Sequence, residues 1–269
     1  MTLRFAKYEG LGNDFVVVDE GAWRASGLSA VSVCDRHRGI GADGVLLVGP
    51  GQGEAVASMV VLNADGSRPE MCGNGLRCVA RYLVDEGRAG EQIDFAVTTD
   101  SGARACRVEG GDVTVAMGPA SLEGEVDADV GEQSVRLLRV SMGNPHAVTF
   151  EPLPFEALAP SLAVHRVFAQ GANVEFVTDR GQGPLEVRVW ERGVGPTLAC
   201  GTGACAVAAA AWATGRRAAG DEVTVRLPGG ELRVRGSGDG QVMMQGPARR
   251  VFGGEVSGAS GQTAGDRAW

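Results

Sequence analysis

Lysine is almost absent from this chain. Lys7 is the single lysine among 25 basic residues, and the others are arginines. Enzymes that use pyridoxal phosphate need a lysine to form the Schiff base with the cofactor. Lys7 lies on a predicted first strand and not in a glycine-rich phosphate site, so we expect no pyridoxal phosphate.

Excess positive charge and long apolar runs are also lacking. The formal charge is -8 at neutral pH, which argues against a nucleic-acid partner because such a partner requires a basic face. No apolar run approaches the ~20 residues that span a bilayer, and residues 1–7 contain no signal-peptide core. We therefore expect no membrane segment and a cytoplasmic location.

The cysteine spacing does not favour a metal site. Six cysteines without a secretion signal indicate free thiols in a reducing compartment. Cys72 and Cys78 are six positions apart and Cys200 and Cys205 are five apart, whereas a zinc knuckle uses the short C-x-x-C. On a helix these gaps place the two sulfurs of each pair on different faces. We predict no bound metal.

Two segments with the same pattern dominate the rest of the sequence. Residues 72–75 and 200–203 both read Cys-Gly-polar-Gly, and a predicted helix follows each of them. A thiol at a helix N-terminus has a lowered pKa, and the glycines and free N–H groups there favour an anion. We therefore expect Cys72 and Cys200 to be reactive toward one substrate. The other thiols are interpreted as buried small hydrophobes: Cys34, Cys78, Cys106 and Cys205.

These segments belong to an internal repeat. Polar or glycine residues recur at corresponding places about 130 positions apart, in the pairs Asn13 and Asn144, Gly44 and Asn173, Asn63 and Glu191, and Cys72 and Cys200. Two halves related by a pseudo-twofold axis would place the two cysteines across a central cleft. A duplicated structural unit without chemistry would give the same spacings, but the polar nature of the repeated residues favours function.

The repeat also predicts the domain boundaries. An N-terminal half over residues 1–119, completed by a last strand at about 250–256, would carry Cys72. A C-terminal half over 120–250 would carry Cys200, and residues 257–269 would form a loose tail. The acidic, poorly periodic segment 120–133 is interpreted as the crossing between the halves.

A dinucleotide site is not expected at residues 39–44, although they match G-x-G-x-x-G. That motif requires a strand before it and a helix after it. Here a predicted helix over 28–37 comes first and a strand over 45–48 follows, which is the reverse order.

Several polar residues near strand ends are candidates for substrate contacts. An asparagine at such a place is often only a turn former, and Glu191 with Arg192 is either a surface ion pair or a carboxylate and guanidinium for a zwitterion. His146 is either a structural histidine or a group that tunes a thiol. The asparagines near strand ends, each either a turn former or a substrate contact, are Asn63, Asn144 and Asn173.

Taken in order, these motifs resemble those of the diaminopimelate epimerase family. The matching segments cover the chain from about residue 4 to 256: 10–15, 63–67, 72–75, 143–146, 191–193 and 199–203. The resemblance implies an α+β fold of two pseudo-symmetric α/β domains, each with a mixed sheet wrapped around a central helix. It implies a homodimeric, cofactor-independent epimerase that interconverts LL- and meso-diaminopimelate in lysine and peptidoglycan-precursor biosynthesis.

The chemistry of such a reaction fits the residues. Inverting Cα without a cofactor requires a base on one face and an acid on the other, and two coupled thiols, Cys72 and Cys200, suit this. The helix N–H groups would hold the α-carboxylate and spread the developing charge. These groups belong to Gly73, Asn74, Gly201 and Thr202.

The resemblance implies further roles. His146 and Glu191 would tune the thiols, and Glu191 would also meet the reacting ammonium. The remaining substrate contacts would come from Asn13, Asn63, Asn144, Asn173 and Arg192. The sequence departs from the family pattern at Gly44, where glutamine is common, which puts one polar contact in doubt, and at Thr202, where serine is commoner.

Three alternatives remain open. A proline or hydroxyproline racemase shares the two-thiol chemistry, although Arg192 and the asparagines favour a longer substrate with a second charged end. A thiol-based redox or ligand-binding protein would also hold two facing cysteines. An inactive structural duplicate would instead bury both thiols.

Overall fold

The chain folds into two compact units, which are described separately. A computed structural model describes residues 2–69 and 72–258. Unit 1 comprises the described residues of Met1–Gly10, Asp14–Gly111 and Ala248–Trp269, and unit 2 comprises Leu11–Asn13 and Asp112–Pro247. Within the described ranges, no helix is long and apolar enough to cross a membrane.

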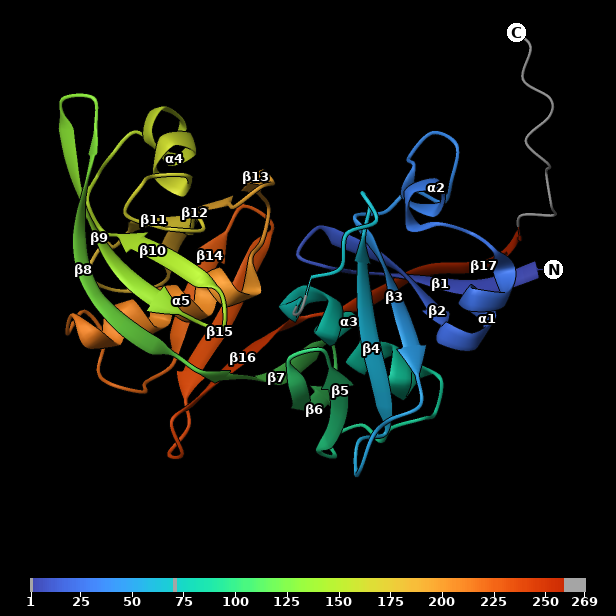
Figure 1. The fold of residues 1–269 in the computed structure, drawn as a ribbon. Coiled ribbons are helices and arrows are strands. Elements are labelled where there is room, and N and C mark those ends of the chain that lie inside the picture. Colours follow the sequence, from blue (N-terminus) through green and yellow to red (C-terminus); the bar gives the residue numbers. More distant parts are fainter. Residues whose placement is uncertain (1, 70–71, 259–269) are drawn as a thin grey trace, which may run out of the picture. The chain divides into compact units, whose positions relative to one another are not determined.

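Unit 1 contains a mixed sheet in the order β17-β1-β2-β3-β4-β5-β6 (Figure 1). The pairs β2–β3 and β4–β5 are parallel, and each is joined through helices, as parallel pairs require. The strands are β1 (Thr2–Gly10), β2 (Asn13–Asp19), β3 (Gly44–Gly49), β4 (Ala57–Asn63), β5 (Phe95–Thr99), β6 (Gly102–Glu109) and β17 (Arg249–Ser257). The helices are α1 (Glu20–Ser26), α2 (Ala30–Cys34) and α3 (Gly73–Asp85).

Unit 2 repeats this topology in the order β8-β9-β10-β11-β12-β14-β15-β16-β7. Its parallel pairs are β10–β11, joined through α4, and β12–β14, joined through α5. The strands are β7 (Asp112–Pro119), β8 (Ser121–Val130), β9 (Gln133–Ser141), β10 (Pro145–Thr149), β11 (Asn173–Thr178), β12 (Leu185–Glu191), β13 (Gly195–Thr197), β14 (Val223–Leu227), β15 (Gly230–Gly236) and β16 (Gln241–Pro247). The helices are α4 (Phe155–Ala163) and α5 (Gly201–Ala213).

Each sheet wraps around one central helix. In unit 1, α3 contacts β1, β3, β4, β6 and β17, and in unit 2, α5 contacts β9, β10, β11, β14, β15 and β16. Residues Ala204–Ala211 of α5 are all buried, and a helix that is apolar on every side must be covered on every side. Small side chains let the strands approach closely. The predicted α+β fold, with a sheet around a helix in each of two pseudo-symmetric units, is confirmed.

The outer face of each sheet carries a second core. In unit 1, Trp23 of α1 and Val33 of α2 pack with residues of β1, β2 and β3. In unit 2, Phe155 and Leu162 of α4 join residues of β8, β9, β10 and β11. The strands β2 and β3 of unit 1 and β10 and β11 of unit 2 are therefore buried on both faces, between the central helix and the peripheral helices.

Some local predictions were wrong. The helix expected over 28–37 is only α2, because the side chain of Asp35 accepts hydrogen bonds from the backbone of His37 and Arg38 and ends the helix in a turn. The segment 120–133 is mostly the strand β8, whose side chains are largely exposed, so no buried face left a periodic signal. Helix α1 was not predicted. β17 ends at Ser257, and the predicted tail lies outside the described residues from 259 on.

Candidate active site

The two predicted thiols occupy the same position in their units. Cys72 is the N-cap of α3 and Cys200 is the N-cap of α5, both with extended backbone, and each helix is 13 residues long. The Sγ atom of Cys72 accepts a hydrogen bond from the backbone N–H of Gly75 at 3.3 Å. The N–H groups of a helix's first turn have no acceptor within the helix. Each thiol therefore lies beside a set of donors suited to an anion.

The environment of Cys200 differs from the expectation for a helix N-terminus. Its side chain is buried at 6% exposure. Burial, followed by the negative charges of Glu191 and Glu175, holds the pKa of the Cys200 thiol well above its usual value. Hydrogen bonds with Thr202 and the Gly203 backbone act in the opposite direction but are weaker. The predicted lowering of the pKa is thus wrong for Cys200, which is a thiol at neutral pH.

Strand ends bring three predicted substrate residues together in unit 2. Asn173 begins β11, and Glu191 ends the neighbouring strand β12. The Asn173 Oδ1 atom accepts the backbone N–H of Arg192 at 2.9 Å, and the Arg192 Nη1 atom donates to the Gln170 carbonyl at 2.9 Å. Glu191 accepts a hydrogen bond from Thr197 Oγ1 at 2.7 Å. Burial is the main cause that raises the pKa of Glu191, which is also close to Glu175.

His146 does not contact a thiol directly in the described structure. Its Nδ1 atom lies 2.7 Å from Glu175 Oε1, and its Nε2 atom lies 3.1 Å from Asn144 Oδ1. The Asn144 Nδ2 atom is 3.5 Å from Thr202 Oγ1, which is itself 3.5 Å from Cys200 Sγ. A chain of polar contacts therefore leads from a buried carboxylate to the thiol.

A cavity of about 370 Å³ opens beside this chain. Its lining includes Asn144, His146, Phe168 and Gln170, and the carbonyl of Gln170 accepts a hydrogen bond from Arg192. A cavity of this size and mixed polarity suits a small polar ligand.

Unit 1 holds the other predicted contacts. Asn63 ends β4 and donates from Nδ2 to Ser67 Oγ at 2.8 Å, and the buried Asn74 accepts from Arg77 Nη2 at 3.0 Å. Gly73 and Asn74 form the first residues of α3. At Gly44, an added Cβ would lie 2.7 Å from the Leu62 carbonyl oxygen, so β3 has no room for a side chain there as the backbone stands.

Asn13 was assigned from the sequence to the N-terminal half, but it belongs to unit 2 with the rest of the turn Leu11–Asn13. A Cβ at Gly12, whose φ is +80°, would lie 3.0 Å from the Leu198 side chain. The turn therefore packs against the segment that precedes Cys200.

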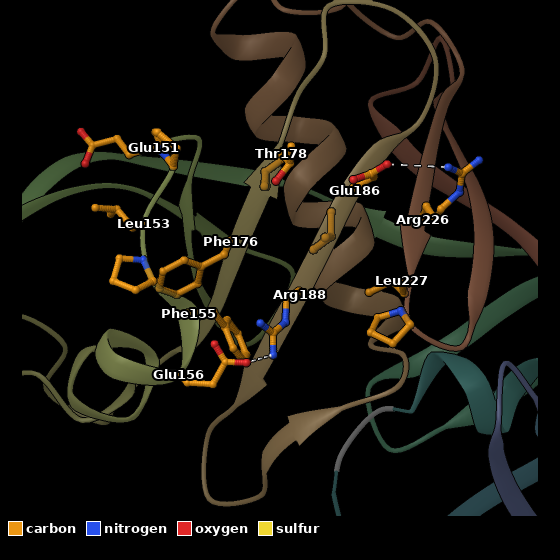
Figure 2. Close-up of a pocket in the computed structure, with 15 residues that line it drawn as sticks. Glu151, Leu153, Phe155, Glu156, Phe176, Thr178, Glu186, Arg188, Arg226 and Leu227 are labelled. Atoms are coloured by element: carbon orange, nitrogen blue, oxygen red, sulfur yellow. Dashed lines mark hydrogen bonds and ion pairs between the residues drawn. The ribbon is translucent and has the colours of Figure 1, made fainter.

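A second cavity, of about 550 Å³, contains none of the predicted site residues. Figure 2 shows its wall of Phe155, Phe176 and Leu227 with charged side chains around the rim. The Arg188 guanidinium lies 4.0 Å from the Phe155 ring centroid and is paired with Glu156. Arg188 and Arg226 of this lining are thus each paired with a carboxylate within unit 2.

The remaining cysteines are inert by position, as expected. All four are buried. Burial raises the pKa of Cys34 to about 11 and that of Cys106 to about 12, and it raises that of Cys78 further. A thiol held protonated in the core is a poor nucleophile and a poor metal ligand.

Two site residues were missed. Glu175 is fully buried in β11 beside His146, and Arg77 is fully buried in α3 beside Asn74. Glu175 had a signal in the sequence, because it is a lone carboxylate within the strand-like run 173–178. The repeat strengthens that signal, since the corresponding residue of unit 1 is Leu46.

The fold is shared with known structures. Solved structures that share it include a probable proline racemase from Agrobacterium radiobacter, with a TM-score of 0.73 and 16% identity, covering 94% of this chain and 92% of that one. A hydroxyproline epimerase from Agrobacterium vitis matches with a TM-score of 0.70 and 16% identity over 95% and 91% of the two chains. The chain thus shares the fold of these two proteins.

Sequence comparison gives the family. The family model for diaminopimelate epimerase matches residues 5–123 and 138–251. The diaminopimelate epimerase of Synechococcus elongatus is 44% identical, over 95% of this chain and 99% of that protein. The diaminopimelate epimerase 1 of a Nostoc species is 41% identical, over 95% and 100%. The chain belongs to the diaminopimelate epimerase family.

Proposed function

We propose that this chain catalyses the cofactor-independent interconversion of LL- and meso-diaminopimelate, with Cys72 and Cys200 as the acid–base pair. The observation that carries this proposal is the position of both thiols as N-caps of equivalent helices, in a chain 44% identical to named diaminopimelate epimerases. The product serves lysine and peptidoglycan-precursor biosynthesis.

In the proposed reaction one sulfur accepts a proton and the other donates one, so no other proton donor or acceptor is needed. A thiolate takes the Cα proton and becomes a thiol, and the electron pair of the broken C–H bond remains on the substrate as a carbanion. The second thiol then donates its proton to the opposite face of Cα and becomes a thiolate. The product leaves with inverted configuration, and the enzyme is set for the reverse reaction.

The environments of the two thiols support different resting roles. Cys200 rests as the acid, because burial and nearby carboxylates hold its pKa high. Cys72 rests as the base, because its sulfur accepts the Gly75 N–H at the positive end of α3. The direction of catalysis decides which thiol reprotonates Cα. After one turnover the proton is on the other sulfur, so each thiol must return to its resting state before the next turnover in the same direction.

Backbone donors at the helix N-termini would hold the reacting α-carboxylate and the negative charge that develops next to it. Gly73 and Asn74 supply such groups in α3, and Gly201 and Thr202 supply them in α5. Within each unit, the helix sets the direction of these N–H groups before substrate binds.

Side chains at the strand ends would recognise the rest of the substrate. Glu191 suits the reacting ammonium, and Arg192 suits a carboxylate as a bidentate partner. The asparagines would satisfy the distal ammonium and carboxylate together with Arg192: Asn13, Asn63, Asn144 and Asn173. His146 and Glu191 would tune the thiols, His146 through the chain of contacts that ends at Cys200.

We further propose that the protein is a cytoplasmic homodimer. Six free cysteines fit a reducing compartment. On the strand β17, Val251 and Phe252 are 52% and 45% exposed, and exposed apolar residues on a sheet strand are typical of a contact with a second chain. Sedimentation of the wild type beside Phe252→Arg tests the dimer, and an unchanged mass for both at the value of one chain would exclude it.

The function is tested by following epimerisation of LL-diaminopimelate under reductant, with L-proline and trans-4-hydroxy-L-proline as control substrates. Conversion of LL- to meso-diaminopimelate by the wild type, and loss of conversion in Cys72→Ala and in Cys200→Ala, is the expected result. Turnover of the proline substrates alone would instead assign the chain to racemisation of a cyclic amino acid.

A further inference from the structure

Glu175 is a buried carboxylate to which the proposed reaction gives no role. It lies in the middle of β11 at 0% exposure. Its Oε1 atom contacts His146 Nδ1 at 2.7 Å, whereas Oε2 is buried without a hydrogen-bond partner among the described residues. A Cβ added at Gly203 would lie 2.8 Å from Oε1, so the carboxylate lies directly against the first turn of α5. A buried acid in such a place needs a partner that neutralises it.

The partner, His146, extends the contact toward the reacting thiol. Its Nε2 atom lies 3.1 Å from Asn144 Oδ1, and the amide nitrogen of Asn144 faces Thr202 Oγ1. Thr202 in turn contacts Cys200 Sγ. Whatever sets the proton on His146 Nε2 therefore also sets which end of the Asn144 amide faces the thiol.

Counting protons along these contacts gives one consistent arrangement. Because Asn144 Oδ1 is an acceptor only, His146 Nε2 must carry a proton. The contact between Nδ1 and Glu175 Oε1 needs a second proton, which is held by one atom or the other. The His146–Glu175 pair thus holds two protons and has no net charge, which is also the arrangement that burial favours.

Losing one of these protons would reverse the amide. A neutral ring that donates from Nδ1 to a carboxylate presents a bare Nε2 atom, which needs a donor. Asn144 would then turn its Nδ2 atom toward the ring and its Oδ1 atom toward Thr202 and Cys200. The Asn144 atom that faces the substrate would then be the acceptor Oδ1 in place of the donor Nδ2, and an acceptor repels a substrate carboxylate.

Among the residues that the structure describes, only those of unit 2 form this pair. Residues Phe15 and Gly44 face each other in the β2–β3 ladder, as His146 and Asn173 do in the β10–β11 ladder. Leu46 therefore corresponds to Glu175, and a Cβ at Gly75 would meet its Cδ2 atom at 2.9 Å, just as a Cβ at Gly203 would meet Glu175. A polar pair in one unit replaces an apolar pair in the other.

We propose that Glu175 is a positioning residue that, by fixing the protons of His146, holds the Asn144 amide nitrogen toward the substrate side of Cys200. This inference rests on the proposed epimerase function for its kinetic part only. The other titratable groups near the pair are Glu191 of β12 and Cys200 of α5.

The variants Glu175→Gln and Glu175→Leu distinguish the role of Glu175 in orienting Asn144 from the effects of its charge and of its side-chain shape. A glutamine amide donates to Nδ1, which keeps the proton on Nε2 and the orientation of Asn144, so kcat/KM should stay within about fivefold of the wild type. Leucine, the residue of the corresponding position in unit 1, leaves His146 without a fixed partner. We expect it to lower kcat/KM by about 10- to 100-fold, the effect of losing one aligned hydrogen bond.

A double-mutant cycle with Asn144→Ala tests whether Glu175 acts through Asn144. In the Asn144→Ala background, Glu175→Leu should lower kcat/KM by less than about threefold, because the group that it positions is gone. Fully additive effects would overturn the proposal. So would a Glu175→Gln variant that is as slow as Glu175→Leu while its thermal unfolding midpoint equals that of the wild type.

Nitrogen-15 NMR of the histidine rings tests the pair without any substrate. The chain has three histidines, and His37 and His165 serve as internal references. We expect Nε2 of His146 to carry a proton in the wild type and in Glu175→Gln, as its contact with Asn144 Oδ1 requires. Glu175→Leu should show a mixture of tautomers. A bare Nε2 atom in the wild type would refute the arrangement even if the enzyme is active, and absence of epimerisation would refute only the proposed function.

Discussion

The Glu191→Gln substitution should lower the pKa of Cys200. Glu191 is the first charged neighbour that raises this pKa, after burial itself. A like charge near a thiol disfavours its ionised form, so removing the charge of Glu191 should lower the pKa of Cys200. The sign follows because a thiolate is more easily formed when a neighbouring negative charge is gone.

Alkylation measures this shift directly. The rate of iodoacetamide labelling at Cys200, followed by mass spectrometry against pH in a Cys72→Ala background, reports the thiolate fraction. Three other buried cysteines serve as internal controls, because Glu191 is not among the groups that shift the pKa of Cys34, Cys78 or Cys106. A midpoint that stays in place or moves to higher pH in Glu191→Gln would refute the electrostatic account of Cys200.

Two further predictions concern stability. Ala208→Leu in the fully buried centre of α5 should destabilise the protein by about 1–3 kcal/mol through overpacking. Ala213→Leu at the exposed end of the helix should change stability by less than about 0.5 kcal/mol. Urea unfolding compares the two variants, and equal effects would contradict a sheet wrapped closely around α5. Lys7→Met removes the 2.6 Å ion pair with Asp14 and should cost about 1–3 kcal/mol at neutral pH. Burial opposes ionisation of Asp14, but hydrogen bonds from Arg36 and Lys7 lower its pKa below the usual value, so this stabilisation is present above the unfolded pKa and is lost as the pH falls below about 4. The stability curves of Lys7→Met and the wild type should therefore converge in acid, and a constant gap at every pH would count against this role.

The elements that carry the proposed chemistry were predictable because their patterns are local. A cysteine followed by Gly-polar-Gly and a run of small residues marks a helix start, and the spacing of the repeat is enough to pair Cys72 with Cys200. Asn173 and Glu191 were also placed correctly at strand ends, since polar residues bound the apolar runs of strands.

What could not be predicted depends on contacts between distant segments. The contact between His146 and Glu175 joins residues 29 positions apart, and only the β10–β11 ladder brings them together. The high pKa of Cys200 likewise results from burial by the surrounding sheet, which outweighs the local helix effect that the sequence indicated. The exposed strand β8 was missed because its pairing with β9 and not its own pattern makes it a strand.

The central claim is that two thiols exchange the Cα proton, and proton NMR of LL-diaminopimelate in D₂O under reductant tests it most directly. The wild type should replace the Cα proton with deuterium as the meso form accumulates, and Cys72→Ala and Cys200→Ala should each abolish that conversion. Formation of meso-diaminopimelate without deuterium at Cα, or undiminished exchange in either variant, would contradict the two-thiol account.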